Sequence, residues 1–331
     1  MARGRVKGAK DDQRGAPLDD AAFARLPTEA IAAGAEAADL DVLPARRVVA
    51  LLAQRERRSV AAVERAAPQI ARVAEAAARA FAAGGRLIYV GAGTSGRLGV
   101  LDASECPPTF GTPPGQVVGV IAGGATALVR AVEGAEDRGD DARAALRKLR
   151  LGRADVVVAI AASGVTPFAR AALEAAHAVG AFAALVTCAP AAARAAGARP
   201  DVLVGLDVGP EILAGSTRLG AGTATKITLN AITTAAMVRA GRCYGPRMVD
   251  LRASSAKLRA RARRLVVDLT GLAAADADVL LGRAGGSVKT AVVMARRQVS
   301  RGEAERRLAA AGGRLRRVIG APGANVKRKK P

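Results

Sequence analysis

The chain has 331 residues, half of them hydrophobic and only 2% aromatic, and its formal net charge is +22. A chain of this length can bury a sizeable core, which here is built mainly from alanine, valine, leucine and isoleucine. The positive charge would suit a nucleic acid partner, but acidic residues are interspersed with the arginines and aromatic stacking residues are scarce, so no specific nucleic acid partner is predicted.

Cysteine and histidine usage argues against metal and disulfide chemistry. The three cysteines are far apart and odd in number, which favours neither a disulfide framework nor a structural zinc site. One histidine, His177, is too few for a histidine-based metal site, so no metal and no cofactor are predicted. No run of 18 apolar residues predicts a membrane span, and residues 1–20 lack the apolar core of a secretory signal. We therefore expect a cytoplasmic protein with no membrane partner.

The first part of the chain is predicted to be mainly helical. Residues 1–20 are expected to form a disordered basic leader, and residues 21–83 an N-terminal helical segment. Helices are expected at 45–54 and 60–83, the second because apolar side chains recur at helical spacing and Gly84 follows its end.

Short apolar runs alternate with helical segments between residues 84 and 250. The runs lie at 87–90, 116–122, 155–162, 182–187 and 202–206, and the helical segments at 125–131, 137–149, 167–178 and 191–196. This alternation is typical of parallel strands buried between two helix layers. We therefore predict an α/β fold for residues 84–250, a doubly wound, mostly parallel, five-stranded sandwich with flanking helices.

The strand signal stops after Ser216. One long helix is expected over residues 216–240, with Ser216 or Thr217 near its N-cap. The rest of the chain is divided into a linking helix, a small C-terminal helical domain of three short helices, and a basic tail, at 251–270, 271–320 and 321–331.

A glycine-rich loop follows the first predicted strand. In Gly91-Ala-Gly-Thr-Ser-Gly-Arg97, the Gly93 backbone and the Thr94 and Ser95 hydroxyls suit a phosphate, and a following helix would aim its positive end at the same place. The loop lacks the Gly-Lys-Ser/Thr ending of a Walker loop and the later acidic residue of a dinucleotide site. A purely structural strand–helix turn is the alternative.

A second loop of the same kind follows the third apolar run. In Ala161-Ala-Ser-Gly-Val-Thr-Pro167, the Ser163 and Thr166 hydroxyls and the Gly164 backbone offer further phosphate ligands. Ligands of open α/β sheets bind beyond the carboxyl ends of the strands, so two such loops can converge on one anion. Ordinary helix capping by Ser163 or Thr166 is the alternative, and it is compatible with phosphate binding.

Five segments together resemble the signature of the N-acetylmuramic acid 6-phosphate etherases, members of the sugar-phosphate isomerase (SIS) superfamily. They lie at 85–111, 131–137, 209–219, 221–224 and 248–250. The resemblance runs from Thr28 to Ile319 and is far more specific than a single glycine motif. It implies an SIS-type fold, and it includes the glucokinase regulatory protein of animals as a relative that binds sugar phosphate without catalysis.

The resemblance also implies an enzyme activity, that of a carbon–oxygen lyase in amino-sugar catabolism and cell-wall recycling. The resemblance implies that the D-lactyl ether at carbon 3 of N-acetylmuramic acid 6-phosphate is cleaved, which gives N-acetylglucosamine 6-phosphate and D-lactate. A base removes the proton at carbon 2 of the open-chain sugar, lactate leaves carbon 3, and water adds back. Two carboxyl groups in different environments can supply the base and the acid without a cofactor. A homodimer in which both chains shape each site is implied as well.

By the same resemblance, Glu105 corresponds to the proton donor for lactate and Glu136 to the second catalytic residue, a base. The largely apolar run around Glu105 favours the protonated carboxyl group that an acid needs. Glu133 is a substitute for Glu136, while Glu211 and Ser216 are further candidates for the substrate pocket. The alternative for Glu105 is a surface carboxylate, and for Glu136 a solvated acidic helix face.

The chain departs from the family pattern at six positions. Arg is expected at Val165, Lys at Gly220, Gln at Thr225, and Asn at Ala32, Pro246 and Ser255. Because several of these positions could line a substrate pocket, the identity of the sugar stays open.

Three other functions stay open from the sequence. A regulatory sugar-phosphate-binding protein would keep the glycine loops but would not need two positioned carboxylates. A phosphosugar isomerase would also need a base beside a carbonyl, but it would release no lactate. A nucleic-acid-binding protein would show an affinity that falls steeply with salt.

Overall fold

The computed structural model describes residues 35–251 and 256–322, and the predicted leader lies outside them. The described chain begins with α2 (Ala35–Ala38), α3 (Ala45–Arg65) and α4 (Ala67–Ala82). The expected break between residues 54 and 60 is wrong, because α3 runs through this segment of good helix formers. The break lies at Ala66, since Pro68 lacks an amide hydrogen and is tolerated only in the first turn of a helix.

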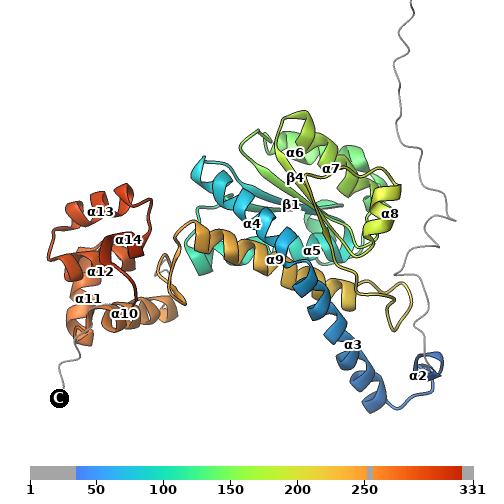
Figure 1. The fold of residues 1–331 in the computed structure, drawn as a ribbon, viewed down its shortest axis with the longest axis horizontal. Coiled ribbons are helices and arrows are strands. Elements are labelled where there is room, and N and C mark those ends of the chain that lie inside the picture. The colour runs from blue at the N-terminus through green and yellow to red at the C-terminus, as the bar shows by residue number, and fades with distance from the viewer. Residues whose placement is uncertain (1–34, 252–255, 323–331) are drawn as a thin grey trace, which may run out of the picture.

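Five parallel strands form the central sheet (Figure 1). They are β1 (Leu87–Gly91), β2 (Val117–Ile121), β3 (Val156–Ile160), β4 (Phe182–Thr187) and β5 (Val202–Gly205). Their order in the sheet is β2-β1-β3-β4-β5, with every neighbouring pair parallel. The predicted five-stranded α/β sandwich is therefore confirmed.

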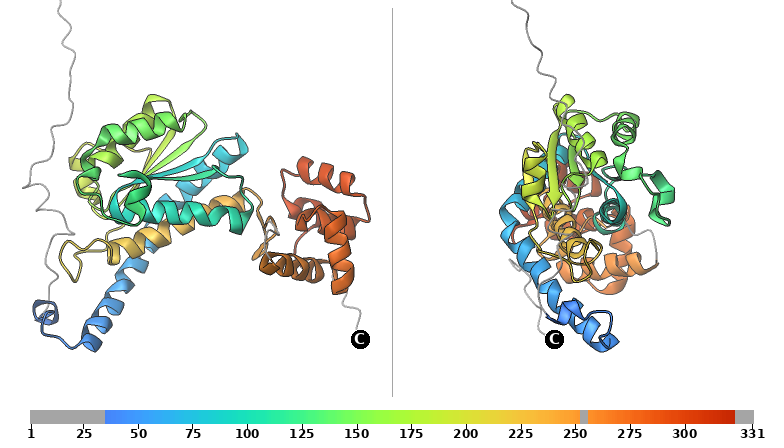
Figure 2. Two further views of the ribbon diagram at one scale, coloured as in Figure 1. Left: turned by 180° about the vertical axis from the view of Figure 1, so that it is seen from behind. Right: turned by 90° about the vertical axis from the view of Figure 1, so that its right-hand side faces the viewer.

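Helices cover both faces of the sheet (Figure 2). The elements between and after the strands are α5 (Gly93–Phe110), η1 (Gly124–Leu128), η2 (Ala135–Asp137), α6 (Gly139–Lys148), α7 (Pro167–Ala178), α8 (Pro190–Ala195) and α9 (Gly220–Arg239). Leu87 and Tyr89 of β1 pack with α4, α5 and α9, whereas Ile88 and Val90 pack with α6 and α7 on the other face. Both faces are buried, which explains why the strand segments are continuously apolar.

The strand order places a topological switch point between β1 and β3. The chain passes from β1 through α5 to β2 on one side, whereas β3, β4 and β5 extend the sheet on the other side. Helices α5 and α7, which follow β1 and β3, lie on opposite faces of the sheet. Such a point leaves a crevice beyond the carboxyl ends of the two strands, which is where open α/β sheets bind ligands.

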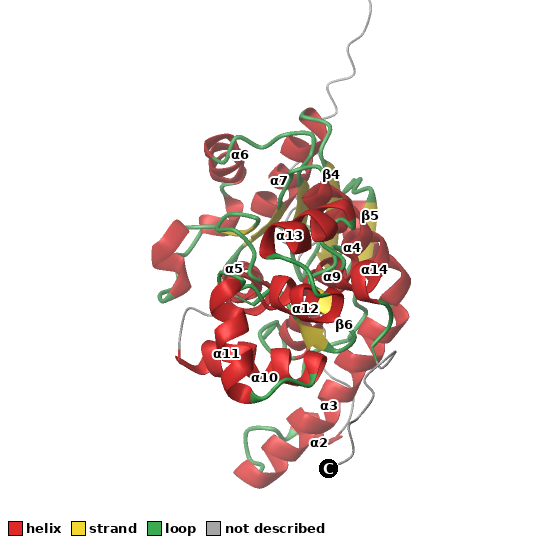
Figure 3. Cartoon of the chain, turned by 90° about the vertical axis from the view of Figure 1, so that its left-hand side faces the viewer, coloured by secondary structure: helices red, strands yellow, loops and turns green. Residues whose placement is uncertain are grey.

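The C-terminal part of the chain is a helical bundle with its own core (Figure 3). It contains α10 (Ala256–Thr270), α11 (Ala274–Arg283), α12 (Val288–Arg297), α13 (Arg301–Ala310) and α14 (Leu315–Ile319). Four helices follow α10 in the described residues instead of the expected three, because the chain turns at Gln298, whose φ is +52°, and Ser300 caps a separate helix α13. A small hairpin of β6 (Cys243–Tyr244) and β7 (Arg247–Met248) precedes the bundle, and strands this short leave no periodic signal in the sequence.

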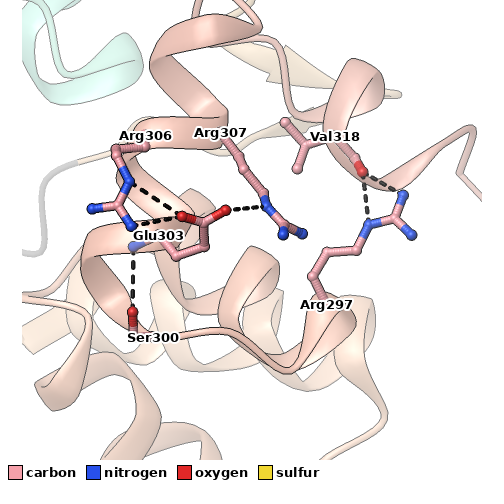
Figure 4. Close-up of polar contacts among 6 residues, drawn as sticks. All are labelled: Arg297, Ser300, Glu303, Arg306, Arg307 and Val318. Carbon is pink, nitrogen blue, oxygen red and sulfur yellow. Dashed lines mark hydrogen bonds and ion pairs between the residues drawn. The ribbon is translucent and has the colours of Figure 1, made fainter.

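Polar contacts order the end of the bundle (Figure 4). The Ser300 hydroxyl accepts the Glu303 amide and caps α13. Glu303 in turn accepts hydrogen bonds from Arg307 and Arg306, which lower the pKa of its carboxyl group. Arg297 of α12 donates to the carbonyl oxygen of Val318, so the short helix α14 is held against α12.

A buried ion pair joins the bundle to the segment that follows α9. Lys289 of α12 lies 2.7 Å from Asp250 Oδ2 and also donates to the Gly313 carbonyl. Burial lowers the pKa of Lys289, while Asp250 opposes that shift. Arg242 contributes a second bond to Asp250 at 3.2 Å. The bundle is thus held to the hairpin segment that follows α9, through a carboxylate that belongs to the etherase-like segment 248–250.

Within the described residues, no helix combines the length and the apolar character that crossing a membrane requires.

Candidate functional site

The glycine-rich segment after β1 is shorter as a loop than its sequence predicts, because α5 already begins at Gly93. Gly93, Thr94 and Ser95 therefore form the first turn of α5, and the first intrahelical bond runs from the Gly96 amide to Ala92. Amides at the start of a helix have no partner within it and carry its partial positive charge. This turn is accordingly suited to an anion such as phosphate.

The glycines of this segment have two different roles. A Cβ at Gly96 would lie 2.5 Å from the Gly91 carbonyl oxygen, and one at Gly99 would lie 2.9 Å from Tyr89 Cβ. These residues let α5 pack closely on β1, which is the structural role considered from the sequence. Gly93 differs, since its φ is +51° and a Cβ there would meet nothing within 4 Å. Only Gly93 leaves open space where a ligand could approach the backbone.

The loop after β3 gathers two hydroxyl groups beside a constrained glycine. Ser163 Oγ lies 3.3 Å from Thr166 Oγ1 and accepts the Val165 amide. Gly164 has a φ of +77°, and a Cβ there would lie 2.7 Å from Ala193 Cβ, so only glycine fits. Thr166 precedes α7 but makes no side-chain capping bond, so the capping alternative is not observed for it.

The two loops meet at one edge of the sheet. Gly91, the last residue of β1, pairs in register with Ile160, the last residue of β3. The starts of α5 and α7 therefore stand at the carboxyl ends of adjacent strands, at the switch point. Thr94, Ser95, Ser163 and Thr166 are all half-buried there.

Glu105 lies on α5 and is exposed. The apolar surroundings expected from its sequence neighbours are not formed by this chain, because Ala103 and Cys106 point to the buried side of the helix. Glu105 therefore presents its carboxyl group on the outer surface of the helix whose first turn contains the phosphate-binding candidates.

Glu133 and Glu136 lie on the segment around η2, and both are exposed. Arg97 of α5 donates to the carbonyl oxygens of Leu128 and Arg130, at 3.3 and 3.5 Å. These bonds tie the segment that leads to Glu133 and Glu136 to the helix that carries Glu105. No described group of three or more His, Cys, Asp and Glu side chains is arranged to hold a metal ion.

Glu211 and Ser216 lie in the loop between β5 and α9. The Glu211 side chain is buried and its carboxylate accepts the Gly220 and Ala221 amides, at 3.0 and 2.9 Å. The expectation that Ser216 or Thr217 caps this helix is wrong, because α9 begins only at Gly220. The cap is the carboxylate of Glu211, which lies nine residues before Gly220 in the chain and accepts the first amides of the helix. Ser216 is half-buried in this loop.

Asp102 is a buried carboxylate that sequence reasoning missed. It accepts hydrogen bonds from the Tyr89 hydroxyl, the Asn230 amide and the Thr233 hydroxyl, at 3.0, 2.6 and 3.2 Å. Burial raises the pKa of Asp102, and these three bonds oppose the shift. The one available signal was its place four residues before the apolar Cys106, which puts both side chains on the same, buried side of α5.

Four of the six positions that depart from the family pattern are described, whereas Ala32 and Ser255 lie outside the described residues. Val165 is buried against Ala189, and Thr225 is buried inside α9. Pro246 is exposed in the turn between β6 and β7, and Gly220 opens α9.

Comparison with known proteins finds a matching family model and similar proteins. Residues 69–177 match the model of the glucokinase regulatory protein N-terminal SIS domain. The N-acetylmuramic acid 6-phosphate etherase of Rhodopirellula baltica is 47% identical over 300 residues, which cover 90% of this chain and 97% of that protein. Proteins of the same name from Trichormus variabilis and Streptomyces coelicolor are 48% and 49% identical, over 85% and 86% of this chain and 91% of each relative. With this identity over most of its length, the chain belongs to the N-acetylmuramic acid 6-phosphate etherase family.

Proposed function

We propose that this protein is a lyase that cleaves the D-lactyl ether of N-acetylmuramic acid 6-phosphate to N-acetylglucosamine 6-phosphate and D-lactate. The observation that carries the proposal is the pair of hydroxyl-bearing helix starts beyond β1 and β3, in a chain of the etherase family. In a bacterium this reaction would serve amino-sugar catabolism and cell-wall recycling.

The phosphate of the substrate would bind between the starts of α5 and α7. Backbone amides at these starts and the dipoles of the two helices favour an anion there. The proposed ligands are the backbones of Gly93 and Gly164 and the side chains of Thr94, Ser95, Ser163 and Thr166.

Two carboxyl groups would divide the proton transfers of the elimination. Glu136 would take the proton from carbon 2, and Glu133 is the alternative candidate for this role. Glu105 would protonate the leaving lactate oxygen. Water then adds to the unsaturated aldehyde to give the product sugar. Support comes from Arg97, which holds the chain before Glu136 to the helix of Glu105.

A second copy of the chain would complete the site, and the protein would act in the cytoplasm. Glu105 and Glu136 are exposed in a single chain, whereas proton transfer in an elimination profits from a site that excludes water. Leu101, four residues before Glu105 on α5, is 50% exposed and lies on the side of the helix that the partner would cover. We propose a homodimer in which this part of α5 is covered by the partner.

We also propose that the chain folds as an SIS domain at 84–250 with a separate helical domain after it. The bundle has a hydrophobic cluster of its own, and α10 contributes Ala262, Val266 and Leu269 to it. We therefore assign the predicted linking helix, 251–270, to the C-terminal domain and not to a separate linker.

The decisive test is D-lactate release from N-acetylmuramic acid 6-phosphate by purified protein treated with a chelator. We expect release at an enzymatic rate in the wild type, and almost none in Glu105→Ala and Glu136→Ala, which should still bind N-acetylglucosamine 6-phosphate. Glu75→Ala is the matched control, since Glu75 is an exposed helical glutamate on α4 and should leave turnover unchanged. Binding of the phosphosugar without lactate release by the wild type would contradict the lyase and favour a regulatory protein.

A further inference from the structure

The carboxylate of Glu211 caps the start of α9. Its Oε2 accepts the Gly220 amide at 3.0 Å and its Oε1 accepts the Ala221 amide at 2.9 Å, with the residue only 5% exposed. These are the first two amides of a 20-residue helix, and neither has a partner within the helix. The negative charge also lies at the positive end of the helix dipole, so the contact is favourable in charge as well as in geometry.

Helix α3 supports this contact from the other side. The Ser59 hydroxyl donates to the carbonyl oxygen of Gly220 at 2.9 Å, and Arg55 donates to the carbonyl oxygen of Pro210, the neighbour of Glu211. Burial and the charge of Arg58 lower the pKa of Arg55, while Glu211 acts to raise it. Glu211 therefore has a cation close by in addition to the two amides.

Gly220 leaves room for this arrangement. A Cβ at this position would lie 3.1 Å from Glu211 Oε2 and 3.3 Å from Ser59 Oγ. Such contacts are tighter than ordinary van der Waals packing, so a side chain at this position would make the carboxylate shift by a few tenths of an ångström relative to the amides. The family resemblance leads us to expect lysine here, whereas the glycine of this chain leaves space for the Glu211 carboxylate on the helix start.

The start of α9 also lies beside the proposed phosphate-binding turn. A Cβ at Gly222 would lie 3.6 Å from Thr94 Cγ2, so the first turn of α9 packs against the first turn of α5. The loop that carries Ser216 lies between Glu211 and Gly220, and the Glu211–Gly220 bond fixes both of its ends. A shift of the α9 start would therefore move Thr94 and Ser216 together.

We propose that Glu211 is a positioning residue for phosphosugar binding and does not itself touch the sugar. It holds the start of α9 against Thr94, and it occupies the α9 amides so that the phosphate is left to the starts of α5 and α7. Gly220 is the partner of Glu211 in this contact, because it has no side chain that would displace the carboxylate. The inference rests on the proposed function for the identity of the sugar.

The test compares Glu211→Gln and Gly220→Ala in D-lactate release from N-acetylmuramic acid 6-phosphate. The glutamine can accept only one amide and turns its own NH2 toward the other, so we expect KM to rise roughly tenfold while kcat stays within about twofold. Gly220→Ala should raise KM in the same direction by roughly threefold to tenfold, although alanine normally stabilises a helix over glycine. Gly282→Ala on α11 is the matched control, because a Cβ there meets nothing within 4 Å and KM should not change.

Three outcomes would overturn the inference. A fall in kcat without a rise in KM in Glu211→Gln would make Glu211 a catalytic residue instead. Unchanged KM in both variants would remove it from binding. If Glu211→Gln does not fold, an unchanged KM in Gly220→Ala alone decides against the inference. Calorimetric measurement of N-acetylglucosamine 6-phosphate binding separates the two proposals. If the wild type releases no lactate but Gly220→Ala binds the phosphosugar more weakly than the wild type, the lyase proposal is wrong and the positioning role of Glu211 is retained.

Discussion

The phenol of Tyr89 donates a hydrogen bond to Asp102 Oδ2 across 3.0 Å, and this contact ties strand β1 to helix α5 inside the core. On the other oxygen, Asn230 and Thr233 of α9 donate to the same carboxylate. One buried charge thus joins the three elements whose ends carry Gly91, Gly93 and Gly220. These bonds therefore contribute to the relative position of the proposed phosphate-binding turn and the α9 start.

Removing the Tyr89 hydroxyl should destabilise the protein. Tyr89→Phe takes one donor from a buried carboxylate, which costs about 1–3 kcal/mol in the free energy of unfolding. Urea denaturation measures the loss. Tyr244→Phe is the control, because that hydroxyl donates to a neutral carbonyl, that of Gly320, at the edge of the bundle. A loss for Tyr89→Phe no larger than that of the control would mean that Asp102 does not depend on this donor.

The stabilising effect of Asp155 should depend on pH. Burial alone would raise its pKa, but hydrogen bonds from Arg86 and from the Gly152 amide hold the pKa of Asp155 below its ordinary value. A carboxyl group with a lowered pKa in the folded state contributes stability above its unfolded pKa and loses it as the pH falls through the folded pKa.

The free energy of unfolding of the wild type should therefore exceed that of Asp155→Asn at pH 7, and the difference should shrink in acid. Urea titrations at pH 7 and near pH 3 measure it, the latter lying below the ordinary pKa of about 4 for aspartate. Asp278→Asn serves as a control, since its ion pair with Arg263 is exposed and worth little. If the free energies of unfolding of the wild type and Asp155→Asn differ by the same amount at pH 7 and near pH 3, the ion pair of Asp155 does not cause the difference.

Two of the cysteines should resist alkylation in the folded protein. Burial raises the pKa of Cys106 and of Cys188 to about 12, so almost no thiolate is present at pH 8. Iodoacetamide at pH 8 followed by mass spectrometry should find both thiols unmodified in native protein and modified in urea. Rapid native labelling of Cys106 would mean that the packing between α5 and β1 opens readily.

Alanine at Gly164 should damage both stability and binding. The new Cβ would lie 2.7 Å from Ala193 Cβ, in a backbone conformation with a φ of +77° that alanine rarely adopts. We expect a loss of about 1–3 kcal/mol in the free energy of unfolding and weaker binding of N-acetylglucosamine 6-phosphate. Gly152→Ala, where a Cβ meets nothing within 4 Å, should change neither. Unchanged phosphosugar affinity in Gly164→Ala would place the phosphate away from this loop.

Part of the candidate site could be predicted from the order of residues alone. Strand runs such as 155–162 are short and apolar, and each of the two that precede a glycine loop leads directly into small or hydroxyl residues. Local sequence is therefore sufficient to place both phosphate-binding candidates at strand ends. The switch point between β1 and β3 followed only from the order of strands in the sheet, which no local pattern contains.

Local chemistry and family likeness in the sequence were sufficient for the α/β class, the five strands, the two glycine loops and the etherase family. Periodicity and turn residues act over a few positions, and the sequence carries them directly. Only the tertiary structure decided that Asp102 is buried, that Glu105 faces outward, and that Glu211 caps α9. Each of these depends on contacts between residues far apart in the chain, such as Ser59 with Gly220, and burial and hydrogen bonding of that kind exist only once the helices have packed.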